Sequence, residues 1–306
     1  MIKKIFYILK PFIPRSLQIY LRRKLVSRQR KIFKDTWPIL PSSAQKPAIW
    51  NGWPDGKDFA FVITHDVELQ GGHDKCKQLM QIEKDLGFVS SFNFVPEGYN
   101  VSAELRKHLK ENGFEVGVHG LNHDGKLFSS KKVFDYRANK INKYIKEWNS
   151  VGFRAPAMHH NLEWLKQLDI EYDLSTFDTD PFEPQSDGVG TIFPFVVNRN
   201  NMQDGYVELP YTLVQDFTVF ILMEEKDNSI WEKKLDWIAA NGGMALINVH
   251  PDYINFENKA SLEEYPIEYY TDFLKFVKIN YANNYWNVLP MELSSFWTRY
   301  SNNTKN

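Results

Sequence analysis

The sequence has 306 residues, of which 43% are hydrophobic and 25% are charged, and its formal net charge at pH 7 is −1. This composition is typical of a globular protein with one large domain or two small ones. The near-zero net charge argues against nucleic acid as a partner. The single cysteine, Cys76, excludes an internal disulfide.

The charge is unevenly distributed, because the first 34 residues contain eleven Lys or Arg and no acidic residue. Between Arg15 and Phe33 the apolar residues recur at helical spacing, and the opposite face of this expected helix is basic. Such a helix can lie on an anionic membrane surface. An ordinary surface helix with a solvated basic face is an equal alternative. The apolar positions in question are Leu17, Tyr20, Leu21 and Leu25.

The apolar run at the N-terminus covers only five residues before Lys10, which is too short for a signal-peptide core or a membrane span. We therefore expect a cytoplasmic protein, with peripheral contact to the inner membrane face through residues 1–34 as an additional hypothesis. We assign residues 1–57 to a basic N-terminal extension and linker, and residues 58–306 to a single domain.

From residue 58 onward, short apolar runs alternate with amphipathic segments. Buried strands joined by helices predict a parallel sheet covered by helices. About seven such units fit a distorted (β/α) barrel, and a doubly wound open sheet is the alternative. Residues 177–222 are less regular and indicate an inserted loop or hairpin. We expect strands over 59–63, 91–95, 114–118, 152–154, 244–249 and 287–289, and helices over 74–86, 102–112, 162–168, 230–240, 267–280 and from 130 onward.

Polar residues follow four of these strands. In parallel α/β folds the active site lies at the carboxyl ends of the strands, so we expect these side chains to converge on one rim. They are Asp66 and Glu68 after the first strand, His119 and His123 after the third, Arg154 after the fourth, and His250 after a late strand.

The spacing within two of these groups favours metal chemistry. His119 and His123 are four residues apart, and on a helical turn this spacing places both imidazoles on one face, where they can bind one metal ion. Asp66 and Glu68 are two apart, so in an extended segment their side chains project to the same side. One carboxylate can then bind a cation while the other acts as a base. Without the shared rim, the simpler interpretation would be two hydrogen-bonded or surface histidines and, for the two carboxylates, a polar loop after a strand.

At these residues the sequence resembles the polysaccharide deacetylases, the family-four carbohydrate esterases. It is most similar to their divergent branch, in which the first motif reads Asp-Val-Asp. The resemblance covers roughly residues 58–290 and rests on several motifs in the family's order. It implies a polysaccharide deacetylase-like (β/α) barrel over residues 58–306.

The resemblance also implies a role for each residue. Asp66 corresponds to the catalytic base, and Glu68 stands where the family has a metal-binding aspartate. His119 and His123 correspond to the metal histidines. Arg154, in an Arg-x-Pro motif with Pro156, would orient the base.

The family's general acid corresponds to His250, at the end of the late strand. A further family motif supplies an aspartate that supports this histidine. Counting along the chain without gaps places it at Asp178, with Asp173 and Asp180 as competitors. His159 and His160 would line the substrate cleft or lie on the surface.

The implied activity is metal-dependent hydrolysis of an N-acetyl group on an amino sugar of a cell-envelope polysaccharide or its precursor. The expected metal is Zn²⁺, although His and carboxylate ligands also admit Co, Ni or Fe. One alternative is hydrolysis of a non-sugar amide or cyclic ureide on the same barrel. The other is a catalytically inactive carbohydrate-binding relative, because Glu68 departs from the family's aspartate.

Overall fold

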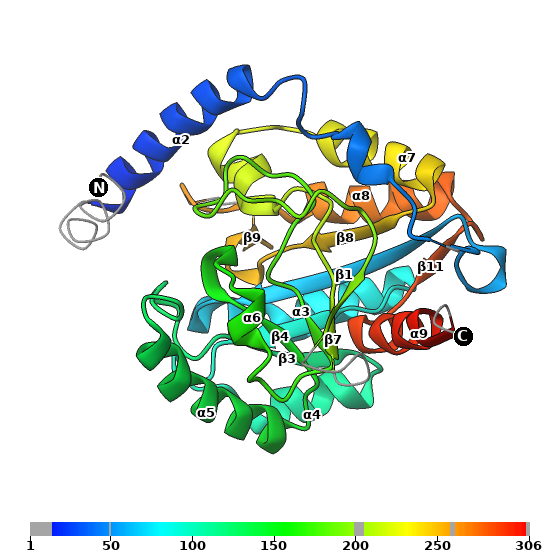
Figure 1. Ribbon diagram of the computed structural model, residues 1–306. Coiled ribbons are helices and arrows are strands. Elements are labelled where there is room, and N and C mark those ends of the chain that lie inside the picture. The colour runs from blue at the N-terminus through cyan, green and yellow to red at the C-terminus, as the bar shows by residue number, and fades with distance from the viewer. Residues whose placement is uncertain (1–13, 49, 199–204, 258–260, 304–306) are drawn as a thin grey trace.

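The computed structural model describes residues 14–48, 50–198, 205–257 and 261–303. Its centre is a parallel sheet that curls into a distorted barrel with helices outside it (Figure 1). The prediction of a distorted (β/α) barrel is therefore confirmed. The strands run in the order β11-β1-β2-β3-β4-β5-β7-β6, and β8 pairs with the free edge of β1.

The parallel strands are short apart from β1, and among the strands that the structure describes only β6 runs antiparallel, forming a hairpin with β7. This hairpin lies in the segment that the sequence marked as irregular. The strands are β1 (Phe59–Val67), β2 (Ser91–Phe94), β3 (Glu115–His119), β4 (Gly152–Arg154), β5 (Tyr172–Asp173), β6 (Phe195–Asn198), β7 (Gly205–Glu208), β8 (Met244–Asn248) and β11 (Tyr285–Asn287), with β9 (Ile254–Asn255) and β10 (Tyr265–Pro266) as a separate pair.

The barrel is closed by a segment outside the named strands. Tyr211 bridges to Phe177 after β5, and Leu213 bridges to Ile247 in β8. Between them, the Thr212 hydroxyl donates to the carbonyl of Met244 at 2.8 Å and accepts the amide of Leu246 at 3.0 Å. We call residues 211–213 the closing segment.

The first strand extends beyond the expected range to Val67, so Thr64, His65 and Asp66 lie within β1 rather than after it. These polar side chains are buried there because β8 satisfies them. The Thr64 hydroxyl donates to the carbonyl of Ile247 at 2.9 Å, and Nδ1 of His65 donates to the carbonyl of Val249 at 2.9 Å. Buried polar groups are tolerated when they are hydrogen-bonded in this way.

The helices begin and end close to the expected residues, and two of them begin with a serine that caps the helix. Ser102 accepts the amide of Leu105 and Ser130 accepts the amide of Val133, as N-cap residues do. The C-terminal helix α9 was not expected. The helices are α2 (Arg15–Ile32), α3 (Gln70–Leu86), α4 (Ala103–Glu111), α5 (Lys131–Trp148), α6 (Leu162–Leu165), α7 (Ser229–Asn241), α8 (Ile267–Asn280) and α9 (Pro290–Asn303), with a π-helix, η5 (Phe217–Leu222).

The segment before the barrel packs onto it. Trp37 and Trp53 belong to the same buried cluster as the barrel core, and the Trp53 indole donates to the carbonyl of Gly242 at 2.9 Å. Helix α2 lies along the outer edge of the molecule (Figure 1), where it contacts η5. In the described part of the chain, no helix is long and apolar enough to cross a bilayer.

Candidate active site

Three side chains at the carboxyl ends of β1 and β3 form a cluster that can hold a metal ion. One ligand atom from each of Glu68, His119 and His123 lies within 4.8 Å of the other two. Nε2 of His123 is 3.0 Å from Oε1 of Glu68. The spacing would place both imidazoles on one face if the segment formed a helical turn, but the structure has no helix here. His119 ends β3 and His123 lies in the loop after it, where Gly120 adopts φ +63° and redirects the chain.

The hydrogen bonding of His119 fits a metal ligand. Its Nδ1 donates to the carbonyl of Arg154 at 3.1 Å, which leaves the lone pair on Nε2. That Nε2 atom is buried and has no hydrogen-bond partner among the residues described. Burial lowers the pKa of His119 to about 4, so the ring is neutral at physiological pH. A neutral imidazole with a free buried nitrogen is the form that binds zinc.

Glu68 is fixed from two sides. The Tyr253 hydroxyl donates to Oε2 at 2.7 Å, while His123 contacts Oε1. Burial alone would raise the pKa of Glu68, but the charge and hydrogen bond of His123 hold it well below its usual value. The carboxylate is therefore ionised and oriented toward the histidines.

Asp66 is a second, more deeply buried carboxylate beside this cluster. Its Oδ1 accepts from Arg154 at 3.1 Å and from Asn93 at 3.2 Å, and its Oδ2 accepts from Asn248 at 2.9 Å. Burial opposes ionisation, but the charge of Arg154, followed by those of His119 and His250, brings the pKa of Asp66 below its ordinary value. Asp66 is thus an ionised carboxylate that remains available to accept a proton.

Arg154 holds this arrangement together from β4. The guanidinium is fully buried, and its Nη1 donates to Thr64, Asp66 and Asn248. Its Nε donates to the carbonyl of Leu174 at 2.9 Å. The side chain therefore links the ends of β1 and β8 instead of forming a surface ion pair.

His250 lies near both carboxylates, and its aspartate partner is Asp216. Oδ1 of Asp216 is 2.6 Å from Nδ1 of His250, and Oδ2 accepts the His250 amide at 2.8 Å. Nε2 of His250 lies 4.0 Å from Asp66 and 3.9 Å from Glu68. Burial would lower the pKa of His250, but the charge and hydrogen bond of Asp216, with Glu68 and Asp66, raise it to about 10.

The assignment of Asp178 as the partner of His250 was therefore wrong. Asp178 forms a buried ion pair with Lys234 at 2.6 Å. The competitors are occupied elsewhere as well, since Asp173 bonds Ser175 and Asp180 accepts from Tyr211. Counting without gaps fails because the β6–β7 hairpin and the closing segment separate this region from Asp216.

Comparisons with known proteins agree with this architecture. No family model matches the chain, and no curated protein matches it. The fold resembles a protein from Mycobacterium smegmatis described as a polysaccharide deacetylase, with 16% identity, TM-score 0.64, and coverage of 84% of this chain and 96% of the other. A similarly described protein from Pseudomonas aeruginosa has 11% identity and TM-score 0.60, covering 87% and 96%.

The chain has the polysaccharide deacetylase fold. The same fold occurs in Puue allantoinase, with 12% identity and TM-score 0.61, over 80% of this chain and 92% of that protein. At these identities the likeness establishes the fold, whereas the chemistry has to be argued from the site itself.

Three residues of the site were not predicted from the sequence: Asp216, Asn248 and Tyr253. A signal for Asp216 was present, because Gln215 and Asp216 follow an apolar run just as the other site residues follow their strands. Asn248 lies two residues before His250, and strand alternation alone places both on the same side. No sequence pattern indicated that Tyr253 would reach Glu68.

The two adjacent histidines after β4 do not join the metal cluster. His160 donates from Nδ1 to the carbonyl of Met158 at 3.0 Å, and its Nε2 lies 3.7 Å from Asp187. His159 lies beside Gly125 in the loop that carries His123. His160 therefore has its partners away from the cluster.

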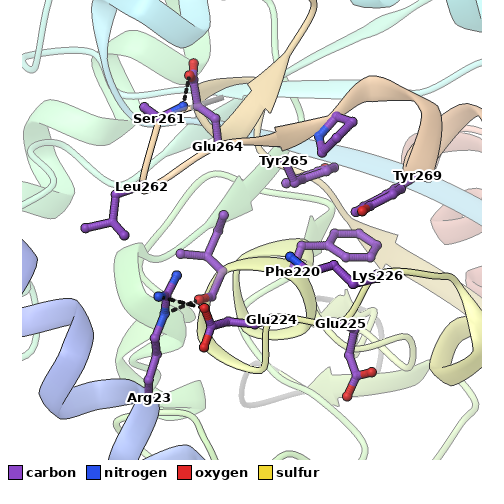
Figure 2. A pocket seen from close by; sticks show the side chains of 12 residues that line it. Arg23, Phe220, Glu224, Glu225, Lys226, Ser261, Leu262, Glu264, Tyr265 and Tyr269 are labelled. Carbon is purple, nitrogen blue, oxygen red and sulfur yellow. Dashed lines mark hydrogen bonds and ion pairs between the residues drawn. The ribbon is translucent and has the colours of Figure 1, made fainter. Parts of the chain in front are cut away.

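A separate cavity of about 330 Å³ lies behind η5, between α2 and the β10–α8 region (Figure 2). Its lining includes Arg23, Phe220, Tyr265 and Tyr269. The Tyr265 hydroxyl donates to Oδ2 of Asp216 at 2.9 Å, and this hydrogen bond links the cavity to the partner of His250. The candidate metal ligands do not line this cavity, so it is not the candidate active site.

Proposed function

We propose that this protein is a metal-dependent hydrolase that removes N-acetyl groups from amino sugars of a cell-envelope polysaccharide or its precursor. The observation that carries the proposal is that an ionised carboxylate and a protonated histidine lie beside the metal cluster. Asp66 is an ionised carboxylate, and His250 carries a proton at neutral pH. Amide hydrolysis needs such a base for the attacking water and such an acid for the leaving amine.

Glu68, His119 and His123 are the residues that would hold the metal, and zinc suits this donor set. A bound Zn²⁺ would supply Lewis-acid polarisation of the amide carbonyl and a lower pKa for water. The protein's own side chains carry out the proton transfers. Two imidazoles and one carboxylate leave room for substrate and water, as catalytic zinc sites do.

Asp66 accepts the proton of the attacking water. Its orientation is fixed by Arg154 and Asn248, which donate to different oxygens of the carboxylate. His250 then donates the proton on Nε2 to the amine that departs, while Asp216 stabilises the positive ring. Nε2 of His250 and Oδ2 of Asp66 are 4.0 Å apart, so the base and the acid can act on the same scissile bond.

The similarity to proteins described as polysaccharide deacetylases supports this choice of reaction. Hydrolysis of a cyclic ureide is the second candidate, because Puue allantoinase shares the fold at comparable similarity. An inactive carbohydrate-binding protein is a third interpretation. The paired base and acid favour an enzyme over this last reading.

The proposed location is the cytoplasm, with residues 1–34 directed toward the inner membrane face. Fractionation of cells that express the full chain tests this location.

The test of the function is acetate release from N-acetylglucosamine oligomers by the zinc-loaded protein, with allantoin as the parallel substrate. The proposal expects acetate release that stops when the metal is chelated and returns with zinc. Turnover of allantoin without any acetate release would favour the ureide reading. A folded, zinc-loaded protein that converts neither substrate would favour the inactive one.

A further inference from the structure

Helix α2 has two faces, and, among the described residues, its basic side chains form ion pairs on one face but not on the other. On the inner face, Ile19 and Val26 are buried, and the arginines are matched to acids of the barrel. Arg15 pairs with Glu263 at 2.7 Å and Arg23 pairs with Glu224 at 2.8 Å, as Figure 2 shows for Arg23; Arg30 pairs with Glu225. The inner face is therefore a neutralised contact surface.

The outer face has no such compensation. Lys24, Arg28 and Lys31 are exposed, and none forms an ion pair with a residue that the structure describes. The segment from Arg15 to Lys34 contains no acidic residue. The side chains between these cations are large and apolar, with exposed fractions from 46% for Leu17 to 62% for Ile32. We call the following set the outer face of α2: Leu17, Tyr20, Leu21, Lys24, Leu25, Arg28, Lys31 and Ile32.

This combination of exposed leucines and unpaired cations on one helical face fits an anionic lipid surface. The apolar side chains can enter the boundary between headgroups and acyl chains, and the cations can contact lipid phosphates. A surface helix that merely needs solubility gains nothing from exposing five large apolar side chains on one side. We propose that the outer face of α2 docks the protein on an anionic bilayer.

The docking helix is close to the metal cluster. The guanidinium of Arg22 lies 4.8 Å above the ring of Phe217, the ring of Phe217 lies 4.6 Å from that of Tyr253, and Tyr253 bonds Glu68. Two aromatic rings thus connect α2 to a candidate metal ligand. If the proposed function holds, a bilayer bound by α2 lies near the site, and the substrate class is an amino sugar carried by a membrane lipid.

Docking is tested with the full-length protein and sedimentation of phosphatidylcholine vesicles, with and without phosphatidylglycerol. We expect binding only with the anionic lipid, and loss of binding at high salt. Lys24→Glu/Arg28→Glu/Lys31→Glu should weaken binding by about a hundredfold or more, because each of the three cations near an anionic surface contributes roughly fivefold. Leu21→Asn/Leu25→Asn should weaken it without changing the charge.

The matched control is Lys132→Glu/Lys143→Glu/Lys146→Glu on α5, which changes the net charge equally on the opposite side of the molecule (Figure 1). Equal loss of binding in the α2 and α5 variants would overturn the proposal, as would binding to neutral vesicles alone. A lipid-free dimer that the α2 leucine variant dissociates would assign the outer face to a second copy of the chain instead.

The substrate consequence has its own measurement. An N-acetylglucosamine lipid embedded in the anionic vesicles should be deacetylated more slowly by the α2 charge variant, whereas soluble N-acetylglucosamine oligomers should be hydrolysed at the unchanged rate. Equal rates for both proteins on the vesicle substrate would refute the lipid-carried substrate. Absence of hydrolysis with both substrates would refute the proposed function and leave the vesicle-binding result standing.

Discussion

Oδ1 of Asp216 lies 2.6 Å from Nδ1 of His250, and the second oxygen of the same carboxylate accepts the backbone amide of His250. Asp216 therefore fixes both the ring and the backbone of the histidine. It also favours the protonated ring, because it is the largest source of the rise in the pKa of His250 to about 10. The neighbouring candidate, Asp178, has no contact of this kind.

Replacing Asp216 by Asn should lower kcat by about 10²- to 10⁴-fold, because the amide can orient the ring but cannot stabilise its positive charge. Loss of the charge lowers the pKa of His250, so the fraction of protonated acid falls at a lower pH. The alkaline limb of the pH–rate profile should therefore move to lower pH. A profile that keeps the wild-type alkaline limb would contradict the role of Asp216.

Asp178→Asn is the matched variant, and it should affect stability instead of catalysis. Lys234 is buried and pairs with Asp178, so removal of the carboxylate leaves a buried cation without its counter-ion. Such losses cost about 3–5 kcal/mol in the free energy of unfolding. Denaturant unfolding should show this cost, while kcat per folded molecule stays near wild type. A large fall in kcat would restore Asp178 to the catalytic set.

Asp66→Asn should reduce acetate release by about 10²- to 10⁴-fold and retain zinc, since Asp66 is proposed as the base and not as a ligand. Asn248→Ala should have a smaller effect of the same kind, because Asp66 keeps its bond to Arg154 and loses the one from Asn248. Steady-state kinetics and metal analysis check both variants. If Asp66→Asn loses its zinc, this carboxylate belongs to the metal ligands.

Zinc should raise the unfolding temperature of the metal-free protein, because a ligand that binds only the folded state stabilises it by about 3 kcal/mol at a hundred times its Kd. His123→Ala should abolish this shift. Tyr253→Phe keeps every metal donor and removes the hydroxyl that holds Glu68. Loss of such a partner weakens metal affinity by about 10- to 100-fold.

His160→Ala serves as the histidine control for the zinc titration, because His160 contacts Asp187 rather than the cluster. Its zinc affinity should equal that of the wild type. If Tyr253→Phe also binds zinc with wild-type affinity, Glu68 is positioned by the histidines alone.

Glu115 predicts a pH dependence of stability away from the active site. Burial raises the pKa of Glu115 to about 7, against an ordinary value of 4.5, although the Tyr172 hydroxyl donates to it at 2.6 Å. The folded state therefore holds this proton more tightly than the unfolded chain between pH 4.5 and 7. The contribution of Glu115 to stability is highest at acidic pH, falls across this window as pH rises, and is constant above it.

Glu115→Gln should remove that part of the slope, because the amide imitates the protonated acid. Relative to the wild type, the variant should gain about 1–3 kcal/mol in the free energy of unfolding between acidic and slightly alkaline pH. Denaturant titrations at several pH values measure the difference. Parallel curves for the two proteins would show that Glu115 titrates normally.

The barrel and the site residues at the strand ends could be predicted, because both depend on local sequence patterns. Apolar runs marked the strands, and polar residues at their ends marked Asp66, His119, Arg154 and His250. Each of these residues is close to the end of its own strand, so small errors in the predicted strand limits do not change its expected place at the rim. The structure brings these residues together as the shared rim of a parallel sheet requires.

The parts that failed depend on long-range geometry. Asp216 reaches His250 only through the closing segment, which makes isolated bridges and has no strand-length signal. His123 reaches the cluster through a loop turned by Gly120, which i, i+4 spacing cannot reveal. Tyr253 bonds Glu68 from 185 residues away along the chain. Side-chain networks between distant loops are fixed by tertiary packing and not by sequence periodicity.

The closing segment has a dynamic consequence. On one edge, β8 joins β1 through five successive residue pairs. On the other edge it is held by one bridge, by the amides of Thr212 and Leu213, which both donate to the carbonyl of Leu246 at 3.0 Å, and by the hydroxyl of Thr212. Local opening proceeds where the fewest bonds must break. The amides of residues 211–213 should thus exchange with solvent before those of β1. Each such opening would loosen Asp216, three residues beyond Leu213, so these three residues of the barrel wall would govern how long the acid histidine keeps its partner.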